Sequence, residues 1–340
     1  MPGPVGQHGA VPRVVAAPDK FRGTATARQV AAAIAAAAAD AGWDCNQVPV
    51  SDGGEGFCDV LGGRRRTTRV HGPLGIPLIA EWRLLPGDTT AVVEMAAASG
   101  LALVGGPLGN DPVRADTRGT GELIADAVKA GARRILVGVG GSASTDGGLA
   151  ALDVLEPHSR LKGVDITVAC DVTTRFVDAA RVFSPQKGAS PAQAELLVRR
   201  LERLVQVYVD RFGADISDRP GSGAAGGLAG GLAAIGASLS SGFEVVAEAI
   251  DIAAFIDEAD LVVTGEGFLD EQSFHGKAVG GVTDLAREAG VGVLVVAGDA
   301  DGDQPVPHCS LTERFGREAA MADTECLVRQ VVAEELRRRA

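Results

Sequence analysis

Short apolar runs alternate with Gly-rich turns and Ala-rich segments along most of this chain. An apolar run followed by a turn and a helical segment is typical of the strands of a largely parallel sheet. The pattern therefore predicts an α/β protein. We expect short strands at residues 13–17, 45–50, 135–139, 164–169, 260–264 and 291–297.

Helical segments follow several of these strands. The first is Ala-rich and stops at Gly42, and either Thr24 or Thr26 is placed to cap its start. A later, charged and amphipathic stretch has Pro191 in its first turn and stops at Gly213. A third has Thr120 as its expected cap. The expected helices are at residues 27–40, 121–130, 190–212, 278–289 and 323–339.

Residues 67–94 break this rhythm. Here β-rich segments are separated only by turns that contain Gly and Pro. Neighbouring strands with such short connections predict an antiparallel piece, which marks an inserted second domain. The expected strands are at residues 67–70, 78–85 and 89–94.

Composition narrows the class of protein. The 340 residues carry a net charge of −12, which does not favour a surface for nucleic acid. No apolar run is long enough for a transmembrane helix, and the first residues lack the regions of a secretory signal. The five cysteines are scattered without a CxxC pair, and the histidines have no metal-ligand spacing. We therefore predict a cytoplasmic protein with reduced thiols and with neither nucleic-acid nor membrane partners.

The richest candidate chemistry lies in the turn after the apolar run at residues 135–139. Glycines and hydroxyl residues fill positions 140–148, and an Ala/Leu-rich stretch follows. Backbone amides of such a turn can approach an anion closely, and the start of a helix favours negative charge. The turn therefore fits a phosphate-binding loop. The alternative is a tight connection from strand to helix that binds nothing.

Charged residues follow the other expected strands. Lys20 and Arg22 lie between the first strand and the first helix, where α/β proteins place ligand groups, although a solvated basic loop is equally compatible. Asp52 and Glu55 lie in a turn with three glycines and could bind a hydroxyl or hydrated Mg²⁺. The alternative for these carboxylates is a helix cap within a turn.

Two further positions suit the reaction of a hydroxyl with a phosphate. Asp171 comes directly after an expected strand, where an ionised carboxylate could act as a general base. Lys187 lies in a turn between helical segments and could reach a phosphate, although a single Lys in a loop is usually only solvated.

The stretch from residue 265 to residue 277 combines carboxylates, an amide, a hydroxyl and a lysine directly after a strand. Such side chains suit Mg²⁺ and a polyphosphate. A Walker A sequence is absent, because Lys277 is followed by Ala278.

Taken together, ten short motifs resemble the glycerate kinase family, in the class that is neither P-loop nor GHMP-like. They occur in the order of the family and cover most of the chain. They are APDKFRGT (17–24), DGGEG (52–56), HGPLG (71–75), VEMAAASGL (93–101), DTRGTGELI (116–124), GVGGSASTDGG (138–148), ACDV (169–172), PQKGA (185–189), GSGAAGG (221–227) and TGEGFLDEQSFHGK (264–277).

The resemblance implies ATP-dependent phosphorylation of glycerate to 2-phosphoglycerate with Mg²⁺. It also implies two α/β domains, one with a parallel Rossmann-like or flavodoxin-like sheet and one with an antiparallel piece, and an active site in the cleft between them. We expect the first domain to comprise residues 11–66, 120–172 and 255–340, and the second residues 67–119 and 173–254. A homodimer is compatible with this family.

The resulting site hypothesis assigns four kinds of role. The catalytic residues are Asp171, Lys20, Asp52 and Lys187. The substrate-binding residues are Arg22, Asp19, Glu55 and Ser142. The nucleotide-binding residues are Gly140, Gly141, Ser144, Asp146, Lys277 and Ser273, and the metal ligands are Asp270 and Glu266.

Three alternatives remain beside this hypothesis. The chain could phosphorylate another small hydroxy acid, or it could be a non-catalytic regulator that binds ligands on the same scaffold. The third is a nucleotide-cofactor oxidoreductase, because residues 138–143 fit the pattern G-x-G-x-x-A. That pattern lacks a convincing acidic ribose partner about 20 residues further on.

Overall fold

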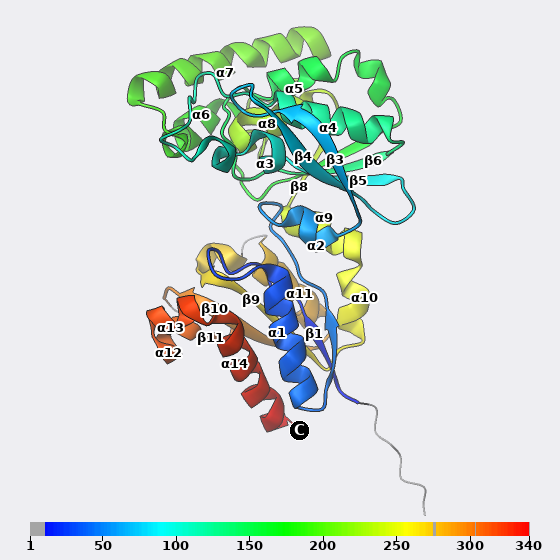
Figure 1. Ribbon diagram of the computed structural model, residues 1–340, viewed down its shortest axis with the longest axis vertical. Helices are drawn as coiled ribbons and strands as arrows, with labels where there is room; N and C mark the ends of the chain where they lie inside the picture. The colour runs from blue at the N-terminus through cyan, green and yellow to red at the C-terminus, as the bar shows by residue number, and fades with distance from the viewer. Residues whose placement is uncertain (1–10, 275–276, 303, 340) are drawn as a thin grey trace, which may run out of the picture. The chain divides into compact units, whose positions relative to one another are not determined.

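The computed structural model describes residues 11–274, 277–302 and 304–339. The chain forms two compact units (Figure 1). Unit 1 comprises Met1–Val50 and Ile250–Ala340, and unit 2 comprises Ser51–Ala249. Unit 2 is therefore an insertion between two parts of unit 1.

Unit 1 is built on a five-stranded sheet in the order β11-β10-β9-β1-β2. All of its strand pairs are parallel. Numbered within the unit, the order is 2-1-3-4-5, the flavodoxin-like arrangement, which confirms one of the two expected sheet types. The strands are β1 (Arg13–Ala16), β2 (Asp44–Gln47), β9 (Leu261–Leu269), β10 (Gly292–Ala300) and β11 (His308–Ser310).

Helices cover both faces of this sheet. Val296 packs in the core that contains helices α1 and α14, whereas its neighbour Val295 packs in a separate core that contains α11. Adjacent residues of a strand point to opposite faces, so the two cores lie on opposite sides of the sheet. The helices are α1 (Ala27–Asp40), α10 (Ile252–Asp257), α11 (Ala278–Glu288), α12 (Leu311–Phe315), α13 (Arg317–Ala322) and α14 (Thr324–Arg339), with the 3₁₀ helix η6 (Glu271–Phe274).

Unit 2 contains a six-stranded sheet in the order β3-β4-β5-β6-β7-β8. The pairs β3–β4 and β4–β5 are antiparallel, as the sequence predicts, and the remaining pairs are parallel. The short strand β8 was not expected. The strands are β3 (Arg64–His71), β4 (Pro77–Leu84), β5 (Thr90–Glu94), β6 (Arg134–Gly138), β7 (Asp165–Ala169) and β8 (Ser238–Ser240).

The division of the chain differs from the expected one. Residues 120–172, which we assigned to the first domain, share a sheet with residues 67–119, because β5 and β6 pair in parallel from Thr90↔Arg134 to Glu94↔Gly138. Helix α4 connects these two strands, so they form one βαβ unit that the assigned boundary would have cut. The antiparallel strands therefore extend a parallel sheet and do not form a domain of their own.

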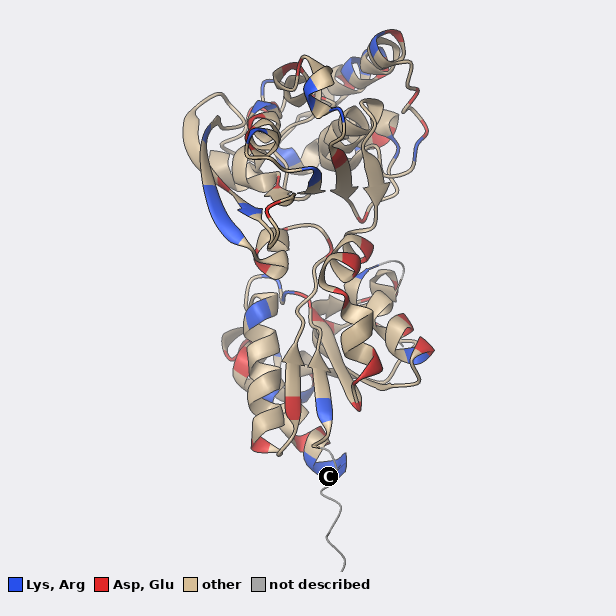
Figure 2. Ribbon diagram, turned by 90° about the vertical axis from the view of Figure 1, so that its right-hand side faces the viewer, with Lys and Arg blue, Asp and Glu red and all other residues tan. Residues whose placement is uncertain are grey.

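The edge strand β3 is rich in arginine, with Arg64, Arg65, Arg66 and Arg69 among its eight residues; Figure 2 draws such residues in blue. We expected the Arg64–Arg66 run to precede the strand, but it forms the first part of the strand. Positive side chains on an edge strand oppose pairing with the edge of another sheet.

The longest helix of unit 2, α7, begins and ends where its sequence signals lie. Ser190 caps it in a reciprocal pair with Gln193, and Gly213 ends it in a left-handed conformation. Helix α4 begins at Arg118, with Thr117 in place of Thr120 at the cap position. The helices are α2 (Phe57–Leu61), α3 (Ala96–Ser99), α4 (Arg118–Lys129), α5 (Leu149–Val154), α6 (Ala179–Phe183), α7 (Pro191–Phe212), α8 (Leu228–Ala234) and α9 (Gly242–Ile250), with the 3₁₀ helices η1 (Leu101–Val104), η2 (His158–Leu161), η3 (Phe176–Asp178), η4 (Pro185–Lys187) and η5 (Ala224–Gly227).

The small residues around η5 and α8 allow close packing. A Cβ on Gly226 would lie 2.1 Å from the carbonyl oxygen of Ser144, and one on Gly230 would lie 2.4 Å from the ring of Phe176. Every residue of α8 is buried. The backbone of this Gly-rich segment therefore packs directly against the loop after β6. Among the described residues, no helix combines the length and apolarity needed to span a membrane.

Candidate functional site

The loops that follow the parallel strands of unit 2 meet at one edge of its sheet. The turn at residues 52–56 packs against the ends of β6 and β7. A Cβ on Gly138 would lie 2.7 Å from the carbonyl oxygen of Gly53, and one on Gly53 would lie 3.0 Å from Ala169. The predicted residues at this edge are Asp52, Glu55, Gly140, Gly141, Ser142, Ser144, Asp146, Asp171 and Lys187.

Backbone hydrogen bonds to residues 99–101 hold the loop after β6, at residues 139–148. The amide of Leu101 donates to the carbonyl of Gly141 at 2.8 Å, and the amide of Ala143 donates to that of Ser99 at 3.0 Å. Gly141 is exposed, whereas Ser142 and Ser144 are buried. The loop is therefore fixed in place with hydroxyl groups in its interior.

Lys187 inserts its ammonium group into this loop. The residue is 2% exposed, and its Nζ donates to Ser142 Oγ at 2.7 Å and to the carbonyl oxygen of Ser144 at 2.6 Å. These two acceptors of the Lys187 ammonium, which are the ones found among the described residues, are both uncharged. Burial lowers the pKa of Lys187 to about 7, and the more distant charge of Asp146 acts in the opposite direction. A solvated lysine, the alternative from the sequence, is thus not what the structure shows.

Two hydroxyl groups of the same loop are buried without a hydrogen-bond partner in the described residues. They are Ser144 Oγ and Thr145 Oγ1, and both residues are fully buried. A buried polar group without a partner is costly, and such groups concentrate at sites that bind a ligand or water.

Asp146 occupies the start of the helix that follows. Its carboxylate accepts hydrogen bonds from the amides of Gly148 and Ala150, at 3.2 and 3.4 Å. It also accepts from the amide and hydroxyl of Thr117, at 3.0 and 2.7 Å. The negative charge that we expected at this helix start is therefore supplied by the chain itself.

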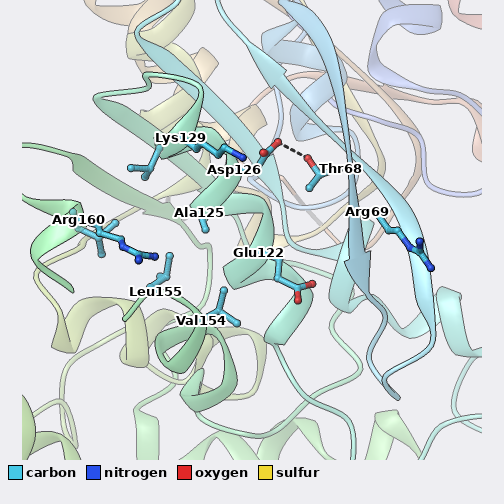
Figure 3. A pocket seen from close by; sticks show the side chains of 11 residues that line it. Thr68, Arg69, Glu122, Ala125, Asp126, Lys129, Val154, Leu155 and Arg160 are labelled. Carbon is cyan, nitrogen blue, oxygen red and sulfur yellow. Dashed lines mark hydrogen bonds between the residues drawn. The ribbon is translucent and has the colours of Figure 1, made fainter. Parts of the chain in front are cut away.

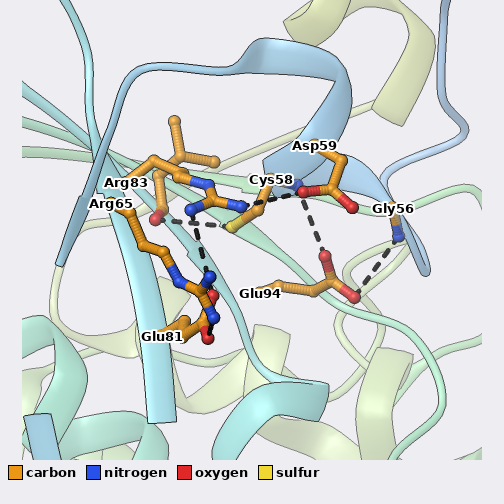
Figure 4. Close-up of polar contacts among 8 residues, drawn as sticks. Gly56, Cys58, Asp59, Arg65, Glu81, Arg83 and Glu94 are labelled. Atoms are coloured by element: carbon orange, nitrogen blue, oxygen red, sulfur yellow. Dashed lines mark hydrogen bonds and ion pairs between the residues drawn. The ribbon is translucent and has the colours of Figure 1, made fainter. Parts of the chain in front are cut away.

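Glu94, at the end of β5, lies beside the turn at residues 52–56 (Figure 4). Its two carboxylate oxygens accept from the amides of Gly56 and Cys58, at 3.4 and 3.3 Å. Burial raises the pKa of Glu94 despite these amides. Burial is also the main cause that raises the pKa of the Cys58 thiol to about 12, so this cysteine is not a nucleophile near neutral pH.

Asp171 follows β7 as predicted, and its carboxylate has a structural partner. Asp171 Oδ1 accepts a hydrogen bond from the amide of Gly242 at 2.7 Å, at the start of α9. The same carboxylate therefore holds a helix end and lies among the loops of the candidate site.

Unit 1 presents a second group of predicted residues at the carboxyl edge of its sheet. The amide of Asp19 donates to the carbonyl of Gly265 at 2.8 Å, which places the loop after β1 beside β9. Asp19 is buried and lies 3.7 Å from Lys20 Nζ, whereas Arg22 is exposed. The predicted residues of this unit are Asp19, Lys20, Arg22, Glu266, Asp270, Ser273 and Lys277.

A cavity of about 770 Å³ lies beside Asp270 in unit 1. The Asp270 carboxylate accepts from the amide and hydroxyl of Ser273, at 3.0 and 3.2 Å. Lys277 stands at the cap position of α11, and residues 275 and 276 of the same motif lie outside the described residues. The cavity is lined by Asp270, Glu271, Gln272, Phe274, Asp301, Gly302, Gln304 and Pro305.

The carboxylate and hydroxyl oxygens at the carboxyl edge of the unit 1 sheet are of the type that can bind Mg²⁺ together with the phosphates of a nucleotide. Within the described ranges no group of three His, Cys, Asp or Glu side chains is placed to hold a metal ion. Mg²⁺ commonly binds through one or two carboxylates, with phosphate and water in its other positions. Asp270, Glu266 and Ser273 carry hard oxygen atoms of this kind.

A further groove, of about 550 Å³, lies between α4, β3 and the segment after α5 in unit 2 (Figure 3). Thr68 donates to Asp126 at 2.6 Å across its wall, and Lys129 and Arg160 lie at its rim. None of the predicted site residues lines this groove.

Sequence reasoning missed three residues that organise unit 2. In the sequence, Glu94 only ends an expected strand and Thr117 only precedes an expected helix. Asn110 lies in a turn, and in the structure its side-chain amide donates to the carbonyl oxygens of Ala143 and Lys187. The position of Glu94 at the carboxyl end of a strand is a signal that could have identified it. The other two act through contacts with distant segments, for which one sequence carries no signal.

Comparison with known proteins gives a consistent result. The chain matches the glycerate kinase family over residues 14–156 and 149–337. It is 42% identical over 310 residues to an uncharacterized protein of Mycobacterium bovis, covering 86% of this chain and 80% of the relative. It is 38% identical over 334 residues to the glycerate 2-kinase of Escherichia coli, with 87% of each chain covered.

Among solved structures, that of a putative glycerate kinase 2 from Salmonella typhimurium superposes with a TM-score of 0.82. The two sequences are 32% identical, and the match covers 96% of this chain and 98% of the other. The fold, the sequence match and the extent of the alignment agree. This chain belongs to the glycerate kinase family and is an enzyme.

Proposed function

We propose that the protein transfers the γ-phosphoryl group of ATP to the 2-hydroxyl of glycerate, giving 2-phosphoglycerate and ADP in the cytoplasm. The observation that carries this proposal is the ammonium of Lys187, which is buried against uncharged oxygens of the loop after β6. Such a charge is poorly compensated until an anion binds beside it. The relative from Escherichia coli, which is named a glycerate 2-kinase, supports glycerate as the acceptor.

Unit 2 supplies the groups that meet the transferred phosphoryl group. Lys187 neutralises its developing negative charge, and Ser144 and the amides of Gly140 and Gly141 donate to its oxygens. Such groups, fixed before the substrate binds, stabilise a transition state without reorganisation. The burial of Ser142 and Ser144 and the backbone bonds of the loop support this role.

The acceptor hydroxyl loses its proton to a carboxylate of the same unit. As its oxygen bonds to phosphorus, the bond from phosphorus to the leaving oxygen of ADP breaks, and the proton passes to Asp171 or to Asp52. Asp171 has one oxygen bonded to the amide of Gly242, and Asp52 has one bonded to that of Gly54 at 3.1 Å. A carboxylate that a hydrogen bond holds in a fixed orientation can act as a general base for the hydroxyl.

Unit 1 supplies ligands for the nucleotide and its metal ion. Asp270 and Glu266 would hold Mg²⁺, and Ser273 and Lys277 would bind phosphate oxygens. When bound, Mg²⁺ neutralises charge on the phosphates. Lys20 and Arg22 bind the carboxylate of glycerate, and Asp19 orients Lys20 through their 3.7 Å ion pair.

A turnover assay tests this function. The protein is incubated with ATP, Mg²⁺ and each enantiomer of glycerate, and the products are resolved by phosphorus NMR. We expect 2-phosphoglycerate from one enantiomer. Formation of 3-phosphoglycerate would overturn the position of transfer. No product from folded protein would reject glycerate and favour another hydroxy acid or a regulatory role.

A further inference from the structure

Lys187 does not hold its place by its side chain alone. Its turn, η4, is separated in the chain from the loop after β6, and a third segment lies against both. Asn110 Nδ2 donates one hydrogen bond to the carbonyl oxygen of Ala143 at 3.1 Å and another to that of Lys187 at 2.9 Å. One side-chain amide therefore joins the turn that carries the ammonium to the loop that receives it.

The backbone around Asn110 strengthens this connection. Gly188, directly after Lys187, has a φ of +94°. A Cβ at this position would lie 2.3 Å from the carbonyl oxygen of Pro107. The segment at residues 107–110 therefore meets the Lys187 turn at two points, one through the backbone and one through the Asn110 amide.

The chemistry of the amide suits this position specifically. Each of its two N–H groups has a carbonyl acceptor, so a carboxylate in its place would turn an oxygen toward two carbonyl oxygens. Asn110 Oδ1 is buried and has no hydrogen-bond partner among the described residues, which fixes the nitrogen as the atom that faces the two carbonyls.

We propose that Asn110 is a positioning residue of this enzyme, which fixes the Lys187 ammonium at the loop after β6 without touching substrate itself. This inference rests on the proposed role of Lys187 in phosphoryl transfer. Because the Lys187 ammonium acts through its position, loosening the turn lowers kcat more than it raises KM.

A double-mutant cycle on turnover separates positioning from a general structural role. Asn110→Ala is compared with the wild type and, separately, within the Lys187→Met variant. We expect Asn110→Ala to lower kcat by about tenfold to a hundredfold in the wild type and to have almost no effect in the Lys187→Met background. Equal losses in both backgrounds, or no loss in either, would overturn the inference.

Amide hydrogen exchange measured by mass spectrometry tests the same claim without turnover. In Asn110→Ala and Asn110→Asp we expect faster exchange confined to residues 140–146 and 185–190. Leu108→Gln is the matched control, because Leu108 lies in the same segment and is fully exposed. Unchanged exchange in both Asn110 variants would contradict the inference, even if the wild type proved inactive toward glycerate. If the wild type does not turn over glycerate but the Asn110 variants show the expected faster amide exchange, only the proposed function is rejected.

Discussion

The two sheets differ in the groups that one loop of each presents. At the edge of unit 2 a buried ammonium, hydroxyl groups and glycine amides lie in the loop after β6, and nearby Asp146 is already bonded to Thr117. In unit 1 the carboxylates of Asp270 and Asp301 line a cavity after β9 and β10. The first set suits an anion and the second a cation. The proposed function needs both kinds of group.

Removal of the Lys187 charge has the largest expected effect on kcat. Lys187→Met should lower kcat by about a thousandfold, because a buried, preorganised charge at the transition state has no substitute. The fold should persist, since the methionine fills much of the same volume. Circular dichroism and steady-state kinetics of the variant measure the two effects. Turnover within a few-fold of the wild type would show that the phosphoryl group is neutralised elsewhere.

The role of Asp171 is the next largest test. Asp171→Asn keeps an acceptor for the Gly242 amide but removes the carboxylate, and we expect kcat to fall by about a hundredfold. Asp171→Ala should lose as much activity and should also lose about 1 kcal/mol of unfolding free energy, because α9 loses its cap. Steady-state kinetics of both variants report on the role of Asp171 as general base, and urea unfolding reports on its role as the cap of α9. If Asp171→Asn is active and Asp52→Asn is not, Asp52 is the base.

A carboxylate of unit 1 should affect the metal requirement. Asp270→Asn should raise the Mg²⁺ concentration needed for half-maximal activity by about tenfold, because it removes one charged ligand. Asp257→Asn is the matched control, since Asp257 is exposed on α10 of the same unit. Activity titrated with Mg²⁺ at saturating ATP gives the comparison. An equal response in both variants would remove Asp270 from the metal site.

The smallest effect concerns stability and pH. The pKa of Lys187 is lowered to about 7 from its ordinary 10.5. Below pH 7 both folded and unfolded chains bind this proton, and the folded state bears the full cost of the buried charge. Between these pKa values the unfolded chain holds a proton that the folded chain lacks, so stability rises with pH. Urea unfolding at about pH 6 and about pH 9 should therefore show the wild type gaining stability relative to Lys187→Met. A constant difference would place the Lys187 pKa outside this range.

The strands and helices were largely predictable because local signals determine them. The Thr26 cap, the helix that ends at Gly213 and the apolar run of β6 appear in the structure at or near their expected positions. The expected division of the chain was not recovered, because strand pairing between β5 and β6 depends on contacts that a single sequence does not reveal. The burial of Lys187 was not predictable for the same reason, because its hydrogen-bond partners Ser142 and Ser144 lie more than 40 residues away in the chain.

The central claim is that the Lys187 ammonium meets the phosphates of the nucleotide. Calorimetric titration with Mg²⁺ and a non-hydrolysable ATP analogue, in buffers of different ionisation enthalpy at about pH 7.5, measures the protons taken up on binding. Because burial lowers the pKa of Lys187 to about 7 and a bound phosphate would raise it, the wild type should take up more protons on binding than Lys187→Met does. Equal proton uptake by the two proteins would contradict the claim.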